Sequence, residues 1–593
     1  MMPHPFVLLG LRRESLRCSV EVGEVRRRWV LGLWLGALAV GLWLGMREKP
    51  WEGSGARHLA QGRALRFEEV VRMQLWWAGV WVAGGLGALG LSGWWWMGWA
   101  RVGEIGASRG ALGEAAGAGA AWGRRSAWLL AGAMLLGLGL RLPRMDRAMD
   151  RDEQDTVRRS MIGYVPQGRP GEPDGKAVVH PWKMTIWECA QANNPFLFSA
   201  VARGTVRGWQ ALVGAEPWRV SLVALRLPSL VAGVLGLGVL GWLGYLAGRP
   251  GVGIGAALLG AVHPLHVEFS TQARGYGMVL LFVPLAMGFA WEALRRGRWR
   301  DWWGMAVSLL GLLMANPGSL YFAASLGFFV GGWLRWRSWR DGGGWAVVGL
   351  SRLGVCVAAV GLGYLPLILP ALPQALAFLK TMKGPLDGMW VLMTWAQYGG
   401  GFFYPSVAVA DPWAEQGRGA VDYLFGGYFR EDPVAAVFLV AGVPWLLWVG
   451  ARWWWGQGGF RPILLGAVGA PLAAYGMHRS AESPFLYYWY LIYWLPGGLL
   501  LTAAALVRLG RGAGPWRGAG LGALYLAVFG FMNRPETGRM SWTGASATEA
   551  QVYVRGRYEW TTRPDGITYR RLLPGRLEKK AEERLGAASP GGL

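Results

Sequence analysis

The stretch AVHPLHVEFSTQARGYGMVLL, Ala261 to Leu281, consists of an apolar segment, a short polar corner and a second apolar segment. The polar corner contains Glu268, Gln272, Arg274 and Tyr276. Two membrane helices joined by a short polar corner have this pattern. An Arg at such a corner lies at the lipid–water boundary, where its guanidinium can hold an anion such as a lipid phosphate.

The composition of the whole chain indicates a membrane protein. Its 593 residues are 53% hydrophobic and 16% charged, with a mean hydropathy of +0.25, whereas a soluble domain carries about 25% charged residues. The charges are confined to segments between long apolar runs. The 94 Gly and 39 Trp residues are typical of packed membrane helices and their interfaces, and a base bias in the coding DNA explains them equally well. We therefore expect an all-α, polytopic integral membrane protein.

The net charge of +24 would suggest nucleic acid in a soluble protein. Here the basic clusters lie at the ends of apolar runs, so the preference of Lys and Arg for the cytoplasmic side explains them, and no nucleic-acid partner is expected. Cys18, Cys189 and Cys356 show neither a disulfide framework nor a zinc spacing. The first apolar run follows Arg26-Arg27-Arg28 and is typical of an uncleaved anchor.

About thirteen segments approach the roughly 20 apolar residues that a membrane span needs. They lie near Val30–Met46, Leu75–Ala100, Ala127–Leu142, Leu222–Ala247, Gly251–Phe269, Tyr276–Leu294, Trp302–Asn316, Gly318–Leu334, Leu353–Leu369, Val434–Val449, Ile463–Tyr475, Tyr487–Leu506 and Gly518–Phe531. Seven Lys/Arg-rich loops fall on one side under this alternation, which predicts that side to be the cytoplasm. The long loops 141–221 and 370–433 are then external, and we expect them to form small helices.

Three regions follow from this topology. Residues 1–126 hold a cytoplasmic N-terminus and two extra spans, residues 127–533 form the main membrane domain, and residues 534–593 form a tail. The tail is external if the number of spans is odd, although its basic Lys579-Lys580 pair argues for the other side. Its alternating pattern and the Pro564-Asp565-Gly566 turn predict a short β-hairpin followed by a disordered end.

The first external loop begins with a cluster of acidic and basic residues that includes Asp152 and Glu153. Residues 152–164 have the pattern of an amphipathic helix on the membrane surface, with Val157, Met161 and Tyr164 on its apolar side. A carboxylate next to a span lies near a low-dielectric boundary, where its pKa can rise and it can act as a general base on a hydroxyl. An ordinary solvated charge cluster is the alternative.

Four motifs occur in a set order between Ala127 and Leu294. They are Asp152-Glu153, Asn194-Pro195-Phe196-Leu197, Arg226-Leu227-Pro228-Ser229 and Pro264…Ser270…Ala273-Arg274-Gly275-Tyr276. In their order and spacing this region resembles the bacterial GT-C glycosyltransferases, the relatives of protein O-mannosyltransferases and aminoarabinose transferases. The resemblance implies an enzyme of the bacterial inner membrane that serves the cell envelope. Such an enzyme takes a sugar from a polyprenyl-phosphate carrier on the periplasmic or outer face.

The chain departs from the family pattern at two places. Asn194-Pro195 stands where the family often has two prolines, and Trp489-Tyr490 stands where an Arg-Tyr pair usually precedes a Pro. Arg479 or His478 would have to supply the missing charge near the donor.

The resemblance and the residue chemistry together predict an inverting glycosyl transfer. Asp152 is expected to act as the catalytic base with Glu153 as its neighbour or orienting group. The cation Arg274, with Tyr276 and with help from Arg226, is expected to bind the departing phosphate. A retaining mechanism would need a second nucleophilic carboxylate, for which Glu268 and Asp411 have no further support.

His263, His266 and Glu268 are candidate supporting residues of the site, together with Asn194 and Arg479. The two histidines and Glu268 also permit a metal site, but interfacial histidines are more often plain hydrogen-bonding groups, so we expect no metal and no cofactor. The expected partners are membrane lipid, the polyprenyl-phosphate sugar and a glycan, lipid or protein acceptor.

Two other classes of function remain open. A transporter or flippase of a polyprenyl-linked glycan would place charged or broken positions near the middle of several spans, and few such positions are present. A noncatalytic membrane assembly protein is permitted by Trp489, which replaces the family's Arg.

Overall fold

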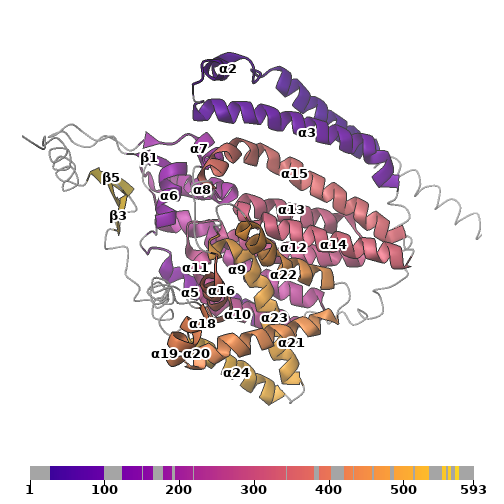
Figure 1. Cartoon of the computed structure of the whole chain (residues 1–593), viewed down its shortest axis with the longest axis vertical. Helices are drawn as coiled ribbons and strands as arrows, with labels where there is room; N and C mark the ends of the chain where they lie inside the picture. Colours follow the sequence, from indigo (N-terminus) through magenta and orange to yellow (C-terminus); the bar gives the residue numbers. More distant parts are fainter. Residues whose placement is uncertain are drawn as a thin grey trace, which may run out of the picture. The chain divides into compact units, whose positions relative to one another are not determined.

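The structure is a computed structural model (Figure 1) that describes most of the chain. The described residues are 27–63, 65–98, 123–147, 149, 151–164, 178–189, 194–217, 220–341, 344–379, 386–401, 420–431, 433–456, 460–480, 486–511, 515–532, 551–555, 558–562 and 568–572. Within them the fold is all-α apart from two small sheets, which confirms the predicted class in its coarse form.

Eight described helices are long and apolar enough to cross a membrane, and a bent pair makes nine if it is one span. The eight are the helix Arg27–Gly45, α3 (Phe67–Gly98), α5 (Arg124–Arg141), α9 (Leu222–Leu246), α12 (Tyr276–Arg296), α15 (Gly344–Leu379), the Pro433–Trp455 helix and the Tyr488–Gly510 helix. The Pro433–Trp455 helix contains α20 (Pro433–Val437), a π-helical turn η4 (Phe438–Gly442) and α21 (Val443–Trp455). The Tyr488–Gly510 helix begins with the 3₁₀ helix η6 (Tyr488–Trp494) and continues as α23 (Leu495–Arg511).

The other expected spans are also helical, but their helices are too short or too polar to qualify. They are α13 (Trp299–Ala315), α14 (Leu320–Asp341), α22 (Arg461–Arg479) and α24 (Pro515–Met532). Four charged residues at its end make α14 less apolar than the sequence of its first half suggests. The described residues therefore support eight or nine of the thirteen expected crossings.

Shorter elements lie between the long helices. They are α2 (Gly53–Ala60), η1 (Leu142–Arg144), α6 (Arg151–Ser160), β1 (Ile162–Tyr164), β2 (Val178–Val179), α7 (Trp182–Trp187), α8 (Phe196–Val213), η2 (Pro317–Ser319), α16 (Gly388–Gly400), α18 (Ala420–Tyr423), η3 (Leu424–Tyr428) and α19 (Phe429–Glu431). The expectation of small helices in the two long loops is met by α6 to α8 and by α16 to α19.

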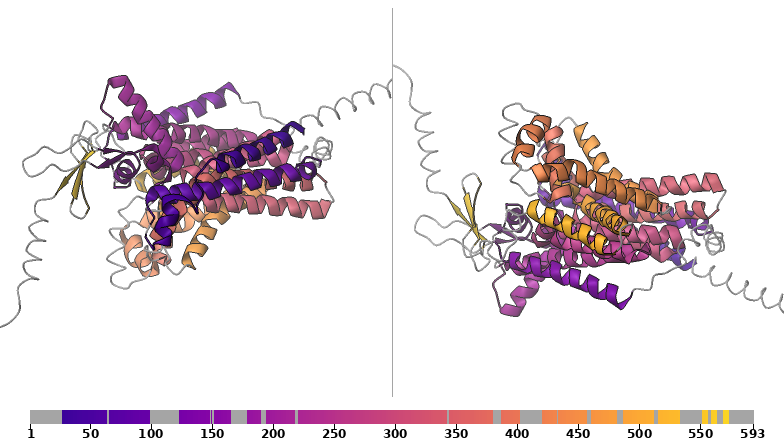
Figure 2. Two further views of the ribbon diagram at one scale, coloured as in Figure 1. Left: turned by 90° about the horizontal axis from the view of Figure 1, so that it is seen from above. Right: turned by 90° about the horizontal axis from the view of Figure 1, so that it is seen from below.

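The helices group into two units. The first consists of Met1–Gly117, Phe289–Leu310 and Gly327–Pro373, and the second of Ala118–Gly288, Gly311–Leu326 and Gln374–Leu593. In the first unit the ring of Trp29 stacks on Trp303 at 6.4 Å, and His58 of α2 bonds Glu69 of α3 at 3.0 Å. All the candidate site residues lie in the second unit. There α9 packs along α5, α8 and α10 (Pro250–Val262), and α23 packs along α10 and α21 (Figures 1 and 2).

A bend of 67° separates α10 (Pro250–Val262) from α11 (Pro264–Thr271). Pro264 cannot donate a backbone hydrogen bond, so the first helix ends and the second begins at this residue. The bend leaves carbonyls of α10 without helical partners. The fully buried guanidinium of Arg141 donates to two of them, the carbonyls of Gly260 (3.3 Å) and Ala261 (3.1 Å). The buried charge of Arg141 thus stabilises the broken span.

The loop helix α6 is shorter than the sequence suggested. It ends at Ser160, and residues 162–164 pair with residues 178–179 as the antiparallel strands β1 and β2. Val157 and Met161 are 1% and 4% exposed, so they pack inside the protein and do not form the free apolar face expected of a surface helix. Local periodicity could not distinguish these two environments.

The tail carries a three-stranded antiparallel sheet of β3 (Gln551–Arg555), β4 (Tyr558–Thr562) and β5 (Thr568–Leu572). Strands β4 and β5 correspond to the hairpin expected around the Pro-Asp-Gly turn, and β3 adds a strand that the sequence reasoning did not predict. The turn itself and the end of the tail lie outside the described residues.

Gly275 lies where α12 begins, directly beneath a neighbouring backbone. A Cβ at this position would collide with the carbonyl oxygen of Ala315. We expect Gly275→Ala to destabilise the protein by about 1–3 kcal/mol, because the clash is with backbone and not with a flexible side chain. Thermal unfolding in detergent measures the effect. Gly332→Ala is the control, since a Cβ there meets nothing within 4 Å. Equal unfolding temperatures for both variants would contradict this close approach.

Candidate functional site

The ends of several helices meet in the second unit, and they are the ends that the predicted topology places outside. The guanidinium of Arg226, near the start of α9, donates to carbonyls of the segment that follows α5, at Arg144, Met145 and Arg147, with distances of 2.6–3.2 Å. Gly275 approaches Ala315 at the end of α13. The Tyr490 side chain lies beside Gly318, in the short helix η2 that follows α13. Sequence-distant polar segments therefore converge on the corner between α11 and α12.

Glu153 and Arg226 form the central ion pair of this region. Arg226 donates through Nε and Nη2 to the two carboxylate oxygens of Glu153, at 2.8 and 2.7 Å. Both side chains are completely buried. The same carboxylate accepts a hydrogen bond from the backbone N–H of Ala273. One carboxylate thus joins α6, α9 and the residue that precedes Arg274.

The environment of Glu153 favours its ionised form. Burial by itself would raise the pKa of Glu153, but the Arg226 guanidinium, together with Arg147 and the Ala273 N–H, holds the pKa below its usual range. Glu153 is therefore a fixed, fully enclosed anion. Arg226 is likewise enclosed, so its expected contact with a donor phosphate stays a prediction without structural support.

Arg274 occupies the corner itself and is 6% exposed. Its Nη1 donates to the Thr156 hydroxyl at 2.9 Å, and its guanidinium lies 5.9 Å from the centre of the Tyr276 ring. Burial would lower the pKa of Arg274, but Tyr276, Asp152 and Tyr490 together raise it above its usual value. Asp152 is half-buried on the first turn of α6. The negative charge of Asp152 therefore interacts with the positive charge of Arg274.

Glu268 is bound by two cations. It accepts one hydrogen bond from Arg144, two from Arg147 and a fourth from the Gln272 amide at 2.9 Å. A carboxylate held in this way is an anchor for the segment after α5. Both oxygens of the Glu268 carboxylate accept hydrogen bonds from described residues, so Glu268 does not have the open geometry of a nucleophile.

His263 and His266 are buried and contact other side chains of the protein. The Nδ1 atom of His266 lies 2.8 Å from Arg141 and 3.2 Å from the Ser270 hydroxyl. His263 is 3% exposed at the bend, with its ring 5.5 Å from that of Phe529. Among the described residues no group of three His, Cys, Asp or Glu side chains is arranged to hold a metal ion.

The late aromatic segment also reaches this region. Tyr490 is one of the groups that raise the pKa of Arg274, and the Tyr398 hydroxyl donates to the carbonyl of Tyr488 at 2.9 Å. Trp489, at the position where the resembled glycosyltransferases usually have an Arg, stacks on Tyr487 at 4.0 Å. Arg479 is exposed at the end of α22, and no interaction within the described residues joins it to the corner. Neither Tyr398 nor Tyr490 was among the site residues expected from the sequence. Tyr490 directly follows Trp489, the position where the resemblance led us to expect an Arg.

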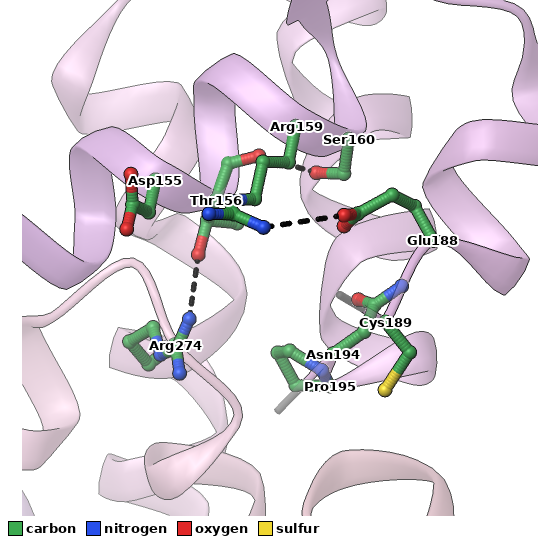
Figure 3. A pocket seen from close by; sticks show the side chains of 9 residues that line it. All are labelled: Asp155, Thr156, Arg159, Ser160, Glu188, Cys189, Asn194, Pro195 and Arg274. Atoms are coloured by element: carbon green, nitrogen blue, oxygen red, sulfur yellow. Dashed lines mark hydrogen bonds and ion pairs between the residues drawn. The ribbon is translucent and has the colours of Figure 1, made fainter. Parts of the chain in front are cut away.

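A polar cavity of about 30 Å³ lies beside Arg274. Its lining comes from α6, from the α7–α8 connection and from the corner, and consists of Asp155, Thr156, Arg159, Ser160, Glu188, Cys189, Asn194, Pro195 and Arg274. Figure 3 shows Arg159 reaching toward Glu188, and Thr156 toward Arg274. The Asn194 amide donates to the Thr185 carbonyl at 3.1 Å and accepts from the Ser199 hydroxyl at 2.9 Å, which fixes this wall. Burial raises the pKa of the Cys189 thiol to about 11, so the thiol is unreactive.

No protein-family model matches the chain, and no curated protein sequence matches it. The resemblance to GT-C glycosyltransferases therefore depends on the four motifs. The structure collects residues from all four of them, Glu153, Asn194, Arg226 and Arg274, around the same corner or its adjoining cavity.

Proposed function

We propose that this protein is an inverting membrane glycosyltransferase that uses a sugar linked to a polyprenyl phosphate. The observation that carries the proposal is the corner between two apolar helices, where Arg274 is fixed by Thr156 and half-buried Asp152 contributes to stabilising its charge. A carboxylate and a fixed cation at a lipid boundary are the two groups that such a transfer requires.

In the proposed reaction, Asp152 accepts the proton of an acceptor hydroxyl. The acceptor oxygen attacks the anomeric carbon of the sugar, and the bond from that carbon to the phosphate oxygen breaks. The electron pair of the broken bond goes to the phosphate, where Arg274 stabilises the developing charge. A low local dielectric constant at this boundary strengthens both interactions.

The remaining charged residues have positioning roles in this proposal. Glu153 and Arg226 hold the backbone at Ala273, which sets the place of Arg274. Glu268 holds Arg144 and Arg147, and Arg141 holds the bent span. A direct phosphate contact by Arg226 is not part of the proposal, because its guanidinium is enclosed.

Transfer of radiolabelled sugar from polyprenyl-phosphate donors by the purified protein tests the proposal, and Arg274→Lys tests its cation. Lys keeps the charge but loses the planar fork that binds phosphate oxygens. We expect transfer to fall roughly tenfold, which corresponds to about 1.4 kcal/mol. Arg300→Lys is the control, because the Arg300 side chain is 65% exposed in the other unit. Absence of transfer by the unmodified protein across a panel of donors would overturn the proposal.

The broken span favours a second candidate function, the transport of a lipid-linked glycan. Discontinuous helices with buried charges are typical of transporters, and α10 and α11 form one such pair beside Arg141 and Glu268. Movement of a fluorescent polyprenyl-linked glycan across vesicles containing the protein, without any sugar transfer, would select this candidate. If the protein showed neither sugar transfer nor transport, the result would indicate a noncatalytic assembly role.

A further inference from the structure

The cavity beside Arg274 carries two negative and two positive groups. Asp155 and Glu188 supply carboxylates, and Arg159 and Arg274 supply guanidiniums. The other polar lining groups are the uncharged side chains of Thr156, Ser160 and Asn194 together with the neutral Cys189 thiol. The four formal charges sum to zero, although the whole chain carries +24.

Each cation of this lining already has a counterpart. Arg159 pairs with Glu188 at 3.4 Å, and Arg274 donates to the Thr156 hydroxyl at 2.9 Å (Figure 3). A ligand group with a net charge would enter a balanced, mostly buried site, where no opposite charge is left over to compensate it. A neutral group with several hydroxyls would instead find acceptors on the carboxylates and a donor on Arg159.

The volume of the cavity also limits its occupant. It measures about 30 Å³, while one buried water needs roughly 10–15 Å³. There is space for more than one water-sized group, such as the neighbouring hydroxyls of a sugar ring that projects in from the corner. A large apolar group would exceed this volume and would offer the polar lining no hydrogen bond.

We propose that this cavity is a subsite that selects an uncharged sugar and disfavours sugars bearing a carboxylate or an amine. The inference rests on the proposed function and narrows its substrate class. The hydroxyls can belong to the donor sugar or to the acceptor sugar, because Arg274 borders both the cavity and the proposed phosphate position. The donor sugar and the acceptor sugar are therefore tested separately.

Two single substitutions unbalance the cavity in opposite directions. Glu188→Gln leaves an excess positive charge, so we expect the preference for neutral over uronic-acid substrates, measured as the ratio of kcat/KM values, to fall roughly tenfold. Arg159→Gln leaves an excess negative charge and should lower the preference for neutral over amino-sugar substrates by a similar factor. The double variant Arg159→Gln/Glu188→Gln is the matched control, since it restores the balance and should return both ratios to within about twofold of the unmodified protein.

The donor arm uses polyprenyl-phosphate-linked hexose, hexuronic acid and amino sugar, and the acceptor arm uses the corresponding aryl glycosides. The arm in which the ratios change identifies the substrate that enters the cavity. Unchanged ratios in both arms would overturn the subsite while leaving the transferase intact. If the unmodified protein transfers no sugar, the proposed function is wrong, and the same compounds then test the subsite by the shifts they produce in thermal unfolding. Shifts of equal size for neutral and charged compounds would overturn it.

Discussion

Replacement of Asp152 with Asn is expected to lower sugar transfer by about 10²–10⁴-fold, the range typical of a positioned general base. Asn has nearly the same shape as Asp but cannot accept the hydroxyl proton. Asp152 is half-buried on α6, and Arg274 lies close enough for Asp152 to stabilise its charge. The substitution should therefore reduce kcat at saturating donor while the protein remains folded. Single-turnover transfer of a radiolabelled sugar measures the chemical step directly.

The neighbouring Asp146 provides a control for the Asp152 experiment. Asp146 is exposed in the segment after α5, so Asp146→Asn removes the same charge from the same loop without touching the corner. We expect its transfer rate to stay within about twofold of the unmodified protein, as for surface substitutions in general. Retained transfer by Asp152→Asn would remove Asp152 from the proposed role. Equal losses in both variants would indicate a general effect of loop charge.

The sequence predicted the membrane class and the approximate place of most helices because both follow from apolar length. The sequence could not give the number of spans. Charged residues at the end of α14 make that helix too polar to count as a span, and α13 is too short to count as one. The end of α6 was also missed. Strand pairing between residues 162–164 and 178–179 is a nonlocal event, and helical periodicity alone carries no information about it.

The candidate site was predictable by residue type but not by role. Arg274 was selected because it lies in a short polar corner between two apolar segments, and Asp152 because it belongs to a charge cluster just after a span. In the structure the charge of Asp152 contributes to stabilising Arg274. Arg226 had the same sequence signature as Arg274, yet one is enclosed by Glu153 and three carbonyls while the other borders a cavity. Only tertiary packing separates a structural arginine from one that lines a cavity. Glu188 and Arg159 escaped selection for a similar reason, because their pairing joins segments that are 29 residues apart.

Replacement of Glu153 with Gln is expected to lower the free energy of unfolding by about 3–5 kcal/mol, because it leaves the Arg226 charge buried without its partner. The effect should depend on pH. The pKa of Glu153 is lowered in the folded protein, so its ionised carboxylate stabilises the fold fully above the unfolded pKa of about 4.3. That contribution is lost as the pH falls through the lowered pKa of the folded state. The difference in stability between the unmodified protein and Glu153→Gln should therefore be greatest near neutral pH and shrink in acid. Denaturant unfolding at several pH values measures both quantities.

A second pair of variants distinguishes loss of the ion pair from loss of packing. Glu216→Gln makes the same chemical change at an exposed position and should leave stability within about 0.5 kcal/mol of the unmodified protein. The double variant Glu153→Gln/Arg226→Met removes the orphaned charge, so it should recover much of the loss caused by Glu153→Gln. Its transfer activity should nevertheless remain low, because the Ala273 N–H loses the carboxylate that sets the position of Arg274. If the double variant regained full transfer, the ion pair would serve stability alone, and the corner would hold Arg274 in place without it.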